Sequence, residues 1–252
     1  MSGKETDERL YERTLGDLRR GKLPGDFNVK LKMCDPKPGE RILDIGCGIG
    51  WFAATVASQY RADVLAIDAS AYAINEASRR YENIGNLHFQ VCDALLIEYE
   101  EAFDKISCLD VLEHFSYEDA QMLLKKIHTA LRQGGSLVLC VPINDFRHLR
   151  PVRHLARFLN IPTFEHKTFF SMQKVEAELR QAGFSIAELS PWFYLEDQLR
   201  IMLPHRIYSL PLIGKYFVGS VNIRAVKNGS ARSSCLRYKG KTSNPVNTLV
   251  HR

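Results

Sequence analysis

A glycine-rich loop between an apolar strand and a helix holds the first residues of this chain that could do chemistry. Residues 42–45 read as a strand that is apolar except for Asp44, and Gly46, Gly48 and Gly50 follow at every second position. Glycine lets a backbone approach a ligand closely, and the unpaired N–H groups at the start of the next helix favour groups that accept hydrogen bonds. The pattern predicts a ligand crevice at the carboxyl edge of an open α/β sheet, with Asp44 pointing into it.

The spacing of the glycines bears on the identity of the ligand. A dinucleotide fingerprint, G-x-G-x-x-G, would place its third glycine where this chain has Trp51, which weakens the pyrophosphate interpretation. An acid that binds ribose hydroxyls is still expected about 20 residues after the loop, at the end of the second strand. The apolar run 64–67 is followed by Asp68, which is the candidate for that role.

Five segments, in order and at matching spacing, connect the chain to a known family. They are Leu43–Gly50, Asp68, Val91–Ala94, Leu109–His114 and Leu131–Leu139. Together they resemble the motifs of class I S-adenosylmethionine-dependent methyltransferases. The resemblance covers about residues 40 to 142. It implies S-adenosyl-L-methionine as the cofactor and a Rossmann-like doubly wound sheet of seven strands with helices on both faces, the last strand antiparallel to the others.

The same resemblance implies which residues hold the methyl donor: the glycine loop, the ribose-binding acid, an acid and a backbone N–H at the adenine, and a residue beside the methionine moiety. These cofactor-binding candidates are Asp44, Gly46, Cys47, Gly48, Gly50, Asp68, Ala69, Asp93, Ala94 and Leu109. Cys47 is interpreted as a small packing residue rather than a nucleophile, because no histidine lies near it in sequence.

Strand and helix signals alternate from the turn at 36–39 onward, as in a parallel α/β sheet. Strands are expected at 42–45, 64–67, 87–92, 104–109, 135–141, 184–189 and 218–226, and helices at 51–60, 70–82, 117–131 and 171–182. We expect one domain over 1–226, with an N-terminal helical region (1–35), a donor-binding half (36–142) and acceptor or lid segments (143–170 and 191–217), followed by a basic flexible tail (227–252).

Two segments fall outside that alternation. In the first, Val152, Leu155, Ala156 and Leu159 share one arc of a basic amphipathic helix, opposite Arg153, His154 and Arg157. The second, 192–217, is rich in aromatic residues. The resemblance implies that both cover an acceptor pocket above the methyl donor. Plain packing on the sheet edge remains an alternative for both, and contact with an anionic membrane surface is a further one for the basic helix.

The chemistry expected of a methyl donor assigns a role to His114. The sulfonium methyl is already electrophilic, so the protein must align a nucleophile and, for a hydroxyl acceptor, remove its proton. His114 follows the fourth strand and is the candidate catalytic base, although a histidine bonded to neighbouring backbone fits the sequence equally well.

The fourth-strand motif looks most like that of the quinone-precursor O-methyltransferases, which implies a small or lipid-like acceptor methylated at oxygen. In some of those enzymes the acids and the histidine of this motif hold a divalent metal, which would map onto Asp110, Glu113 and His114. The prediction here is no metal, because Asp110 is shorter than the Glu usual at its position. A nicotinamide-dependent oxidoreductase and a non-catalytic S-adenosylmethionine-binding protein are the alternative functions.

Composition sets wider limits. With 252 residues, 45% apolar and 25% charged, the chain has the makeup of a soluble globular protein. It shows no signal-peptide pattern and no long apolar run, so a cytoplasmic location is expected, with peripheral membrane contact open. Six cysteines without a C-x-x-C pair indicate free thiols. The net charge of +5 comes from the C-terminal fifth. No base-handling motif favours nucleic acid as a partner, and the oligomeric state stays open.

Overall fold

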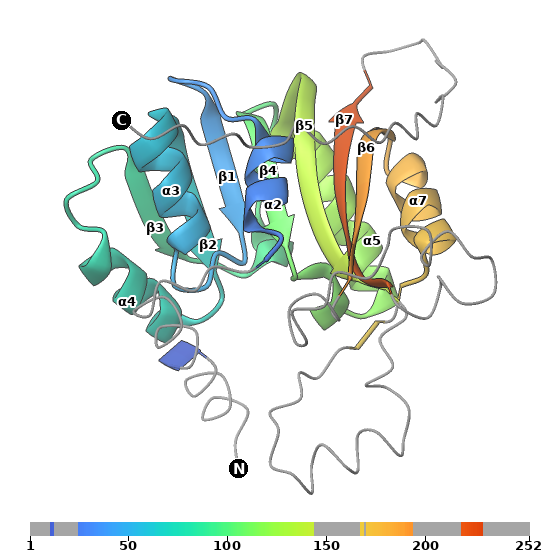
Figure 1. Cartoon of the computed structure of the whole chain (residues 1–252), viewed down its shortest axis with the longest axis horizontal. Coiled ribbons are helices and arrows are strands. Elements are labelled where there is room, and N and C mark those ends of the chain that lie inside the picture. Colours follow the sequence, from blue (N-terminus) through green and yellow to red (C-terminus); the bar gives the residue numbers. More distant parts are fainter. Residues whose placement is uncertain (1–10, 13–24, 144–166, 169, 194–217, 229–252) are drawn as a thin grey trace, which may run out of the picture.

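The computed structural model describes residues 11–12, 25–143, 167–168, 170–193 and 218–228 (Figure 1). The predicted basic helix at 151–159 and the tail from 229 lie outside the described residues, as do most of the N-terminal helical region and of the aromatic segment. Within the part described, no helix is both long enough and apolar enough to cross a membrane.

The described strands form a single seven-stranded sheet in the order β3-β2-β1-β4-β5-β7-β6. The strands are β1 (Arg41–Ile45), β2 (Asp63–Asp68), β3 (Leu87–Val91), β4 (Phe103–Leu109), β5 (Leu131–Pro142), β6 (Phe184–Phe193) and β7 (Val218–Lys227). The first five strands pair in parallel, whereas β7 runs antiparallel to both β5 and β6. This arrangement confirms the predicted fold class, including the antiparallel last strand.

Helices cover both faces of the sheet. Figure 1 shows α2 and α3 on the near face and α5 on the far face. The helices are α2 (Phe27–Cys34), α3 (Trp51–Tyr60), α4 (Ala71–Arg80), α5 (Tyr117–Ala130) and α7 (Met172–Gln181), with 3-10 turns η1 (Ala94–Leu96) and η2 (Leu112–His114). Serines begin three of the helices: the hydroxyls of Ser70, Ser116 and Ser171 each accept a backbone N–H of the first turn.

Each face of the sheet has its own apolar core. One core joins α5 and α7 to the sheet through fully buried side chains such as Leu123, Ile127 and Leu179. The other joins α2 and α3 to the opposite face, with Met33 and Val56 at its centre. Because parallel strands are buried on both faces, β1 reads as an almost continuous apolar run, and Asp44 is conspicuous within it.

Several boundaries differ from those expected. The segment before the turn at 36–39 forms a helix, α2, which lies at the end of the expected N-terminal helical region (1–35). Strand β6 continues to Phe193, so the first two aromatic residues of the 192–217 segment belong to the sheet. Helix α5 ends one residue early, because Leu131 is extended and pairs with Phe103 as the start of β5.

Candidate functional site

The strand order creates a crevice at the carboxyl edge of the sheet. The chain order reverses between β1 and β4, and such switch points are where open α/β sheets bind ligands. The loops that follow these two strands touch: a Cβ added to Gly46 would lie 2.3 Å from Cγ2 of Val111. The glycine loop and the residues after β4 therefore line one site.

The three loop glycines occupy conformations that side chains disfavour. Their φ angles are +68° at Gly46, +53° at Gly48 and +76° at Gly50. A Cβ on Gly50 would lie 2.5 Å from the ring of Phe89, which is closer than real contacts allow. The loop therefore needs glycine at these positions for both backbone and packing reasons, as its spacing predicts.

Asp68 lies beside the glycine loop, as predicted for a ribose-binding acid. It ends β2, and its Oδ2 accepts the Gly48 N–H at 2.8 Å while its Oδ1 accepts the Ser70 N–H at 2.8 Å. Ala69, next in sequence, is exposed. The Tyr11 hydroxyl also reaches Oδ1, at 3.5 Å, and its ring lies 3.3 Å from where a Cβ of Gly48 would be.

Tyr11 was not a candidate from sequence. Its N-terminal region shows helical periodicity, but no pattern there indicates that it returns to the glycine loop. Long-range packing of this kind leaves no local signal.

Asp44 is buried at the floor of the crevice. The residue is 2% exposed, and its Oδ1 accepts a hydrogen bond from the Ser107 hydroxyl at 2.6 Å. Among the described residues, Oδ2 has no hydrogen-bond partner. Burial raises the pKa of this carboxyl to about 7; the Ser107 hydrogen bond opposes the shift and the Asp68 charge adds to it. A buried oxygen with spare capacity at this position suits a ligand group that donates hydrogen bonds.

The candidates for the adenine lie at the end of β3, beyond Asp68. The Cys92 N–H donates to the Asp68 carbonyl at 2.9 Å, which joins this segment to the end of β2. Asp93 is exposed and its Oδ1 accepts the Leu95 N–H at 2.9 Å, so that it caps the turn containing buried Ala94. Leu109 ends β4 half-buried, on the other side of the crevice.

A charged cluster holds the end of β4. Asp110 follows this strand with a φ of +57°, and its Oδ2 accepts from the Lys30 ammonium at 2.9 Å. Its Oδ1 accepts the Cys140 thiol at 3.2 Å. Lys30 also lies 3.2 Å from Asp26. Lys30 was not a candidate from sequence, because no local pattern around it indicates that its ammonium reaches the end of β4.

His114 ends η2 and is half-buried, one turn beyond Asp110. The carbonyl of the preceding residue, Glu113, accepts the N–H groups of Lys167 and Thr168 at 2.9 and 3.1 Å. The chain after the undescribed insert thus returns to the candidate base.

The metal alternative does not fit these residues. Asp110 already binds an ammonium group, and Glu113 is 2% exposed. Over the described ranges, no three His, Cys, Asp or Glu side chains are grouped so as to hold a metal ion.

The thiol in the glycine loop is not an activated nucleophile. Cys47 is buried, and this burial raises the pKa of its thiol above the ordinary value, with Asp44 and Asp68 adding to the effect. The packing interpretation is therefore the better one. The cysteines of the described ranges, Cys34, Cys47, Cys92, Cys108 and Cys140, are all free thiols.

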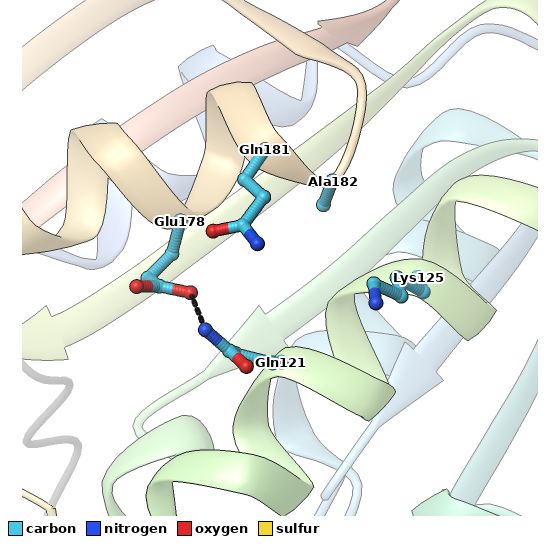
Figure 2. Close-up of a pocket in the computed structure, with 5 residues that line it drawn as sticks. All are labelled: Gln121, Lys125, Glu178, Gln181 and Ala182. Carbon is cyan, nitrogen blue, oxygen red and sulfur yellow. Dashed lines mark hydrogen bonds between the residues drawn. The ribbon is translucent and has the colours of Figure 1, made fainter.

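A shallow surface depression lies elsewhere, between α5 and α7 (Figure 2). It is lined by Gln121, Lys125, Glu178, Gln181 and Ala182. Glu178 already accepts hydrogen bonds from the Tyr117 hydroxyl and the Gln121 amide. None of the lining residues belongs to the crevice, and we assign no ligand to this depression.

The fold and the crevice define a class of protein, the Rossmann-like methyltransferases. A model of the methyltransferase domain family matches residues 12–189, and the chain belongs to this family, the class I S-adenosylmethionine-dependent methyltransferases. S-adenosyl-L-methionine is accordingly its cofactor. Neither the oxidoreductase nor the non-catalytic alternative is favoured by these comparisons.

Two of the similar proteins are O-methyltransferases by name. The chain is 34% identical over 174 residues to an O-methyltransferase, cnsE, of Penicillium expansum, covering 67% of this chain and 59% of the relative. It is 25% identical over 164 residues to a ubiquinone biosynthesis O-methyltransferase of Acinetobacter baumannii, covering 62% and 68%.

A solved structure, phosphoethanolamine N-methyltransferase 2 of Haemonchus contortus in complex with S-adenosyl-L-methionine, shares the fold. Its TM-score is 0.62 at 21% identity, covering 81% of this chain and 52% of that one. The chain thus spans only part of the length of several proteins that it matches.

Proposed function

We propose that this chain transfers the methyl group of S-adenosylmethionine to a hydroxyl oxygen of a small or lipid-like acceptor. The observation that carries the proposal is the meeting of Asp68 with the glycine loop, where the carboxylate lies 2.8 Å from the Gly48 nitrogen. A carboxylate fixed by backbone N–H groups at a switch-point crevice suits a ribose diol, and the missing third glycine of a dinucleotide fingerprint disfavours pyrophosphate.

The donor is placed along the crevice by its polar groups. The ribose hydroxyls would donate to the carboxylate of Asp68, which the N–H groups of Gly48 and Ser70 hold beside the glycine loop. Asp93 and the N–H of Ala94 would meet the adenine, since the end of β3 lies beyond Asp68. The methionine end then points the other way, past Asp44 and Leu109 toward β4.

In the proposed reaction the bound donor supplies an electrophilic methyl group. The task of the protein is to align the acceptor for in-line attack and to take its proton. His114 is proposed as the base, since it is half-buried at the β4 end of the crevice. The acceptor hydroxyl would donate to the imidazole and lose its proton as the carbon–oxygen bond forms and the methyl–sulfur bond breaks, with the bonding electron pair left on the sulfur.

Oxygen is favoured as the methylated atom because the Penicillium and Acinetobacter relatives are O-methyltransferases by name. A nitrogen acceptor is the second candidate, since a phosphoethanolamine N-methyltransferase of Caenorhabditis elegans is 32% identical over 123 residues. Methyl transfer to a catechol beside transfer to phosphoethanolamine, measured with labelled donor, distinguishes the two classes.

Donor binding is tested by calorimetry on Asp68→Ala. The change removes charge-assisted hydrogen bonds of about 1.5–3 kcal/mol each, so the donor should bind at least about tenfold more weakly. Asp63→Ala is the matched control, because Asp63 begins the same strand and is exposed. Unchanged affinity in Asp68→Ala, or tight binding of nicotinamide nucleotides by the native protein, would overturn the placement.

We further infer a cytoplasmic enzyme of one domain over 1–226 with a basic tail, in which the 144–170 segment covers the acceptor or meets an anionic membrane. The support is the sequence pattern at 151–159. Sedimentation of Arg153→Glu/Arg157→Glu with anionic vesicles tests the membrane contact, and a large loss of melting temperature in Leu155→Ala would favour plain packing instead.

A further inference from the structure

Lys30 is a buried cation with two carboxylate partners. Its residue is 3% exposed, and its Nζ lies 2.9 Å from Asp110 Oδ2 and 3.2 Å from Asp26 Oδ2. Burial by itself lowers the pKa of the ammonium, but the charges of Asp110 and Asp26 outweigh it and leave the pKa above its ordinary value. A buried ammonium persists only with such partners, so the cluster is a specified feature of the fold.

Elements far apart in sequence hold Lys30 in place. Asp26, just before α2, also accepts from the Asn222 amide of β7 at 3.2 Å, and Asn222 is fully buried. Cys140 of β5 donates its thiol to Asp110 at 3.2 Å, and its carbonyl accepts the Asp110 N–H at 3.0 Å. One charged group therefore ties α2, β5 and β7 to the end of β4.

Asp110 is the member of the cluster that a ligand can reach. Its side chain is 51% exposed, whereas those of Lys30 and Asp26 are 4% and 7% exposed. The surrounding protein raises the pKa of Asp110, but the Lys30 charge and hydrogen bond lower it more, leaving a net pKa below the ordinary value. Two carboxylates and one ammonium leave one negative charge, presented at Asp110.

The position of Asp110 relative to the crevice suggests what this charge meets. The next residue, Val111, lies against Gly46 of the glycine loop. If the ribose lies on Asp68, on the β2 side, then the sulfur of the donor lies toward β4. That sulfur is positively charged in the donor and neutral in the demethylated product.

We propose that Lys30 is a positioning residue that, with Asp26, fixes the Asp110 carboxylate at the sulfonium end of the bound donor, so that the site binds S-adenosylmethionine in preference to S-adenosylhomocysteine. The inference rests on the donor placement proposed above. It needs no acceptor, because the discrimination operates on the donor and its product alone.

The test is calorimetry with both ligands on the full chain, reported as the ratio of their dissociation constants. Asp110→Asn should reduce the preference for the donor by about fivefold, the scale of one partly solvated charge interaction. Lys30→Met separates a positioning role of Lys30 from a simple effect of its charge. If only charge mattered, removing this cation would raise the preference for the positively charged donor. If Lys30 fixes the Asp110 carboxylate in place, removing it lowers the preference. In Asp110→Asn, adding Lys30→Met should change the ratio no further.

Two variants keep the result decisive. Asn222→Ala loosens Asp26 without altering charge, so it should lower the preference even if Lys30→Met does not fold. Lys105→Met is the matched control, because Lys105 pairs with Glu40 at 2.7 Å at the opposite end of β4. It should cost stability and leave the ratio unchanged.

The inference and the donor placement fail separately. An unchanged ratio in Asp110→Asn, or a higher preference in Lys30→Met, overturns the inference. Unchanged binding of both ligands in Asp68→Ala overturns the placement instead.

Discussion

Two aspartates on neighbouring strands of the crevice show how differently one side chain can be held. Asp44 of β1 has a hydroxyl for a partner and a raised pKa, whereas Asp110 after β4 has an ammonium and a lowered one. The β1 side of the site is thus built from neutral donors and backbone N–H groups, and the β4 side from an ion pair. The first side keeps hydrogen-bonding capacity for a ligand, and the second presents a fixed charge.

The largest effect is expected where the two sides touch. Gly46→Ala would force a side chain into a φ of +68° and place its Cβ 2.3 Å from the stiff side chain of Val111. We expect a loss of about 2–3 kcal/mol in the free energy of unfolding and donor binding weakened by about a hundredfold or more.

Urea denaturation and donor calorimetry measure this effect. Gly85→Ala is the control, since nothing lies within 4 Å of a Cβ added there. If Gly46→Ala bound the donor normally, contact between the two loops would not be needed to form the site.

The next effect concerns Asp44 and depends on pH. The pKa of Asp44 in the folded state, about 7, exceeds the ordinary value of 3.8. Between these two pH values the folded state therefore keeps a proton that the unfolded state releases. The contribution of this group to stability is complete at low pH and falls as pH rises from about 4 to 7, by roughly 4 kcal/mol in total. Asp44→Asn should remove this slope and be more stable than the native protein at pH 8.

Unfolding of the native protein and of Asp44→Asn at pH 5 and pH 8 tests this prediction. The same variant should bind the donor more weakly, because the spare oxygen of Asp44 is lost to the ligand. If the difference in unfolding free energy between the native protein and Asp44→Asn were the same at pH 5 and pH 8, the Asp44 carboxyl would not have a raised pKa in the folded state.

The two sides also differ in how far the sequence predicted them. The β1 side could be predicted, because a glycine loop, an aspartate at the end of a strand (Asp68) and the spacing between them are local signals of a backbone shape. Most strands and helices were located to within one or two residues for the same reason, since an apolar run or a helical period is local. Asp68, the candidate for the ribose hydroxyls, lies next to the loop.

The β4 side could not be predicted from the sequence. Lys30 lies on α2, within the expected helical region, but a helical pattern does not indicate which distant residues it contacts. Asp26 and Asn222 are bonded although they are 196 positions apart in sequence. A buried ion pair between distant elements depends on tertiary packing, which periodicity does not contain. The extension of β6 to Phe193 was missed because its pairing with β7, rather than its composition, continues the strand.

The smallest effect is expected at a third carboxylate, outside the crevice. Glu178 of α7 is 7% exposed and accepts from the Tyr117 hydroxyl and, at 2.8 Å, from the Gln121 amide of α5 (Figure 2). Burial raises its pKa, as it does for Asp44, but here the hydrogen-bond partners, Tyr117 and Gln121, come from helix α5. Glu178→Ala should therefore cost only about 1–2 kcal/mol of folding free energy, the scale of lost hydrogen bonds, and should leave donor affinity unchanged. Glu178→Gln, which keeps an acceptor for Tyr117, should recover part of that loss.

Chemical denaturation and donor calorimetry on both variants test this prediction. Weaker donor binding in either variant would mean that the α5–α7 face is coupled to the crevice. In that case burial of a carboxylate, rather than its place at the switch point, would mark the functional residues of this protein.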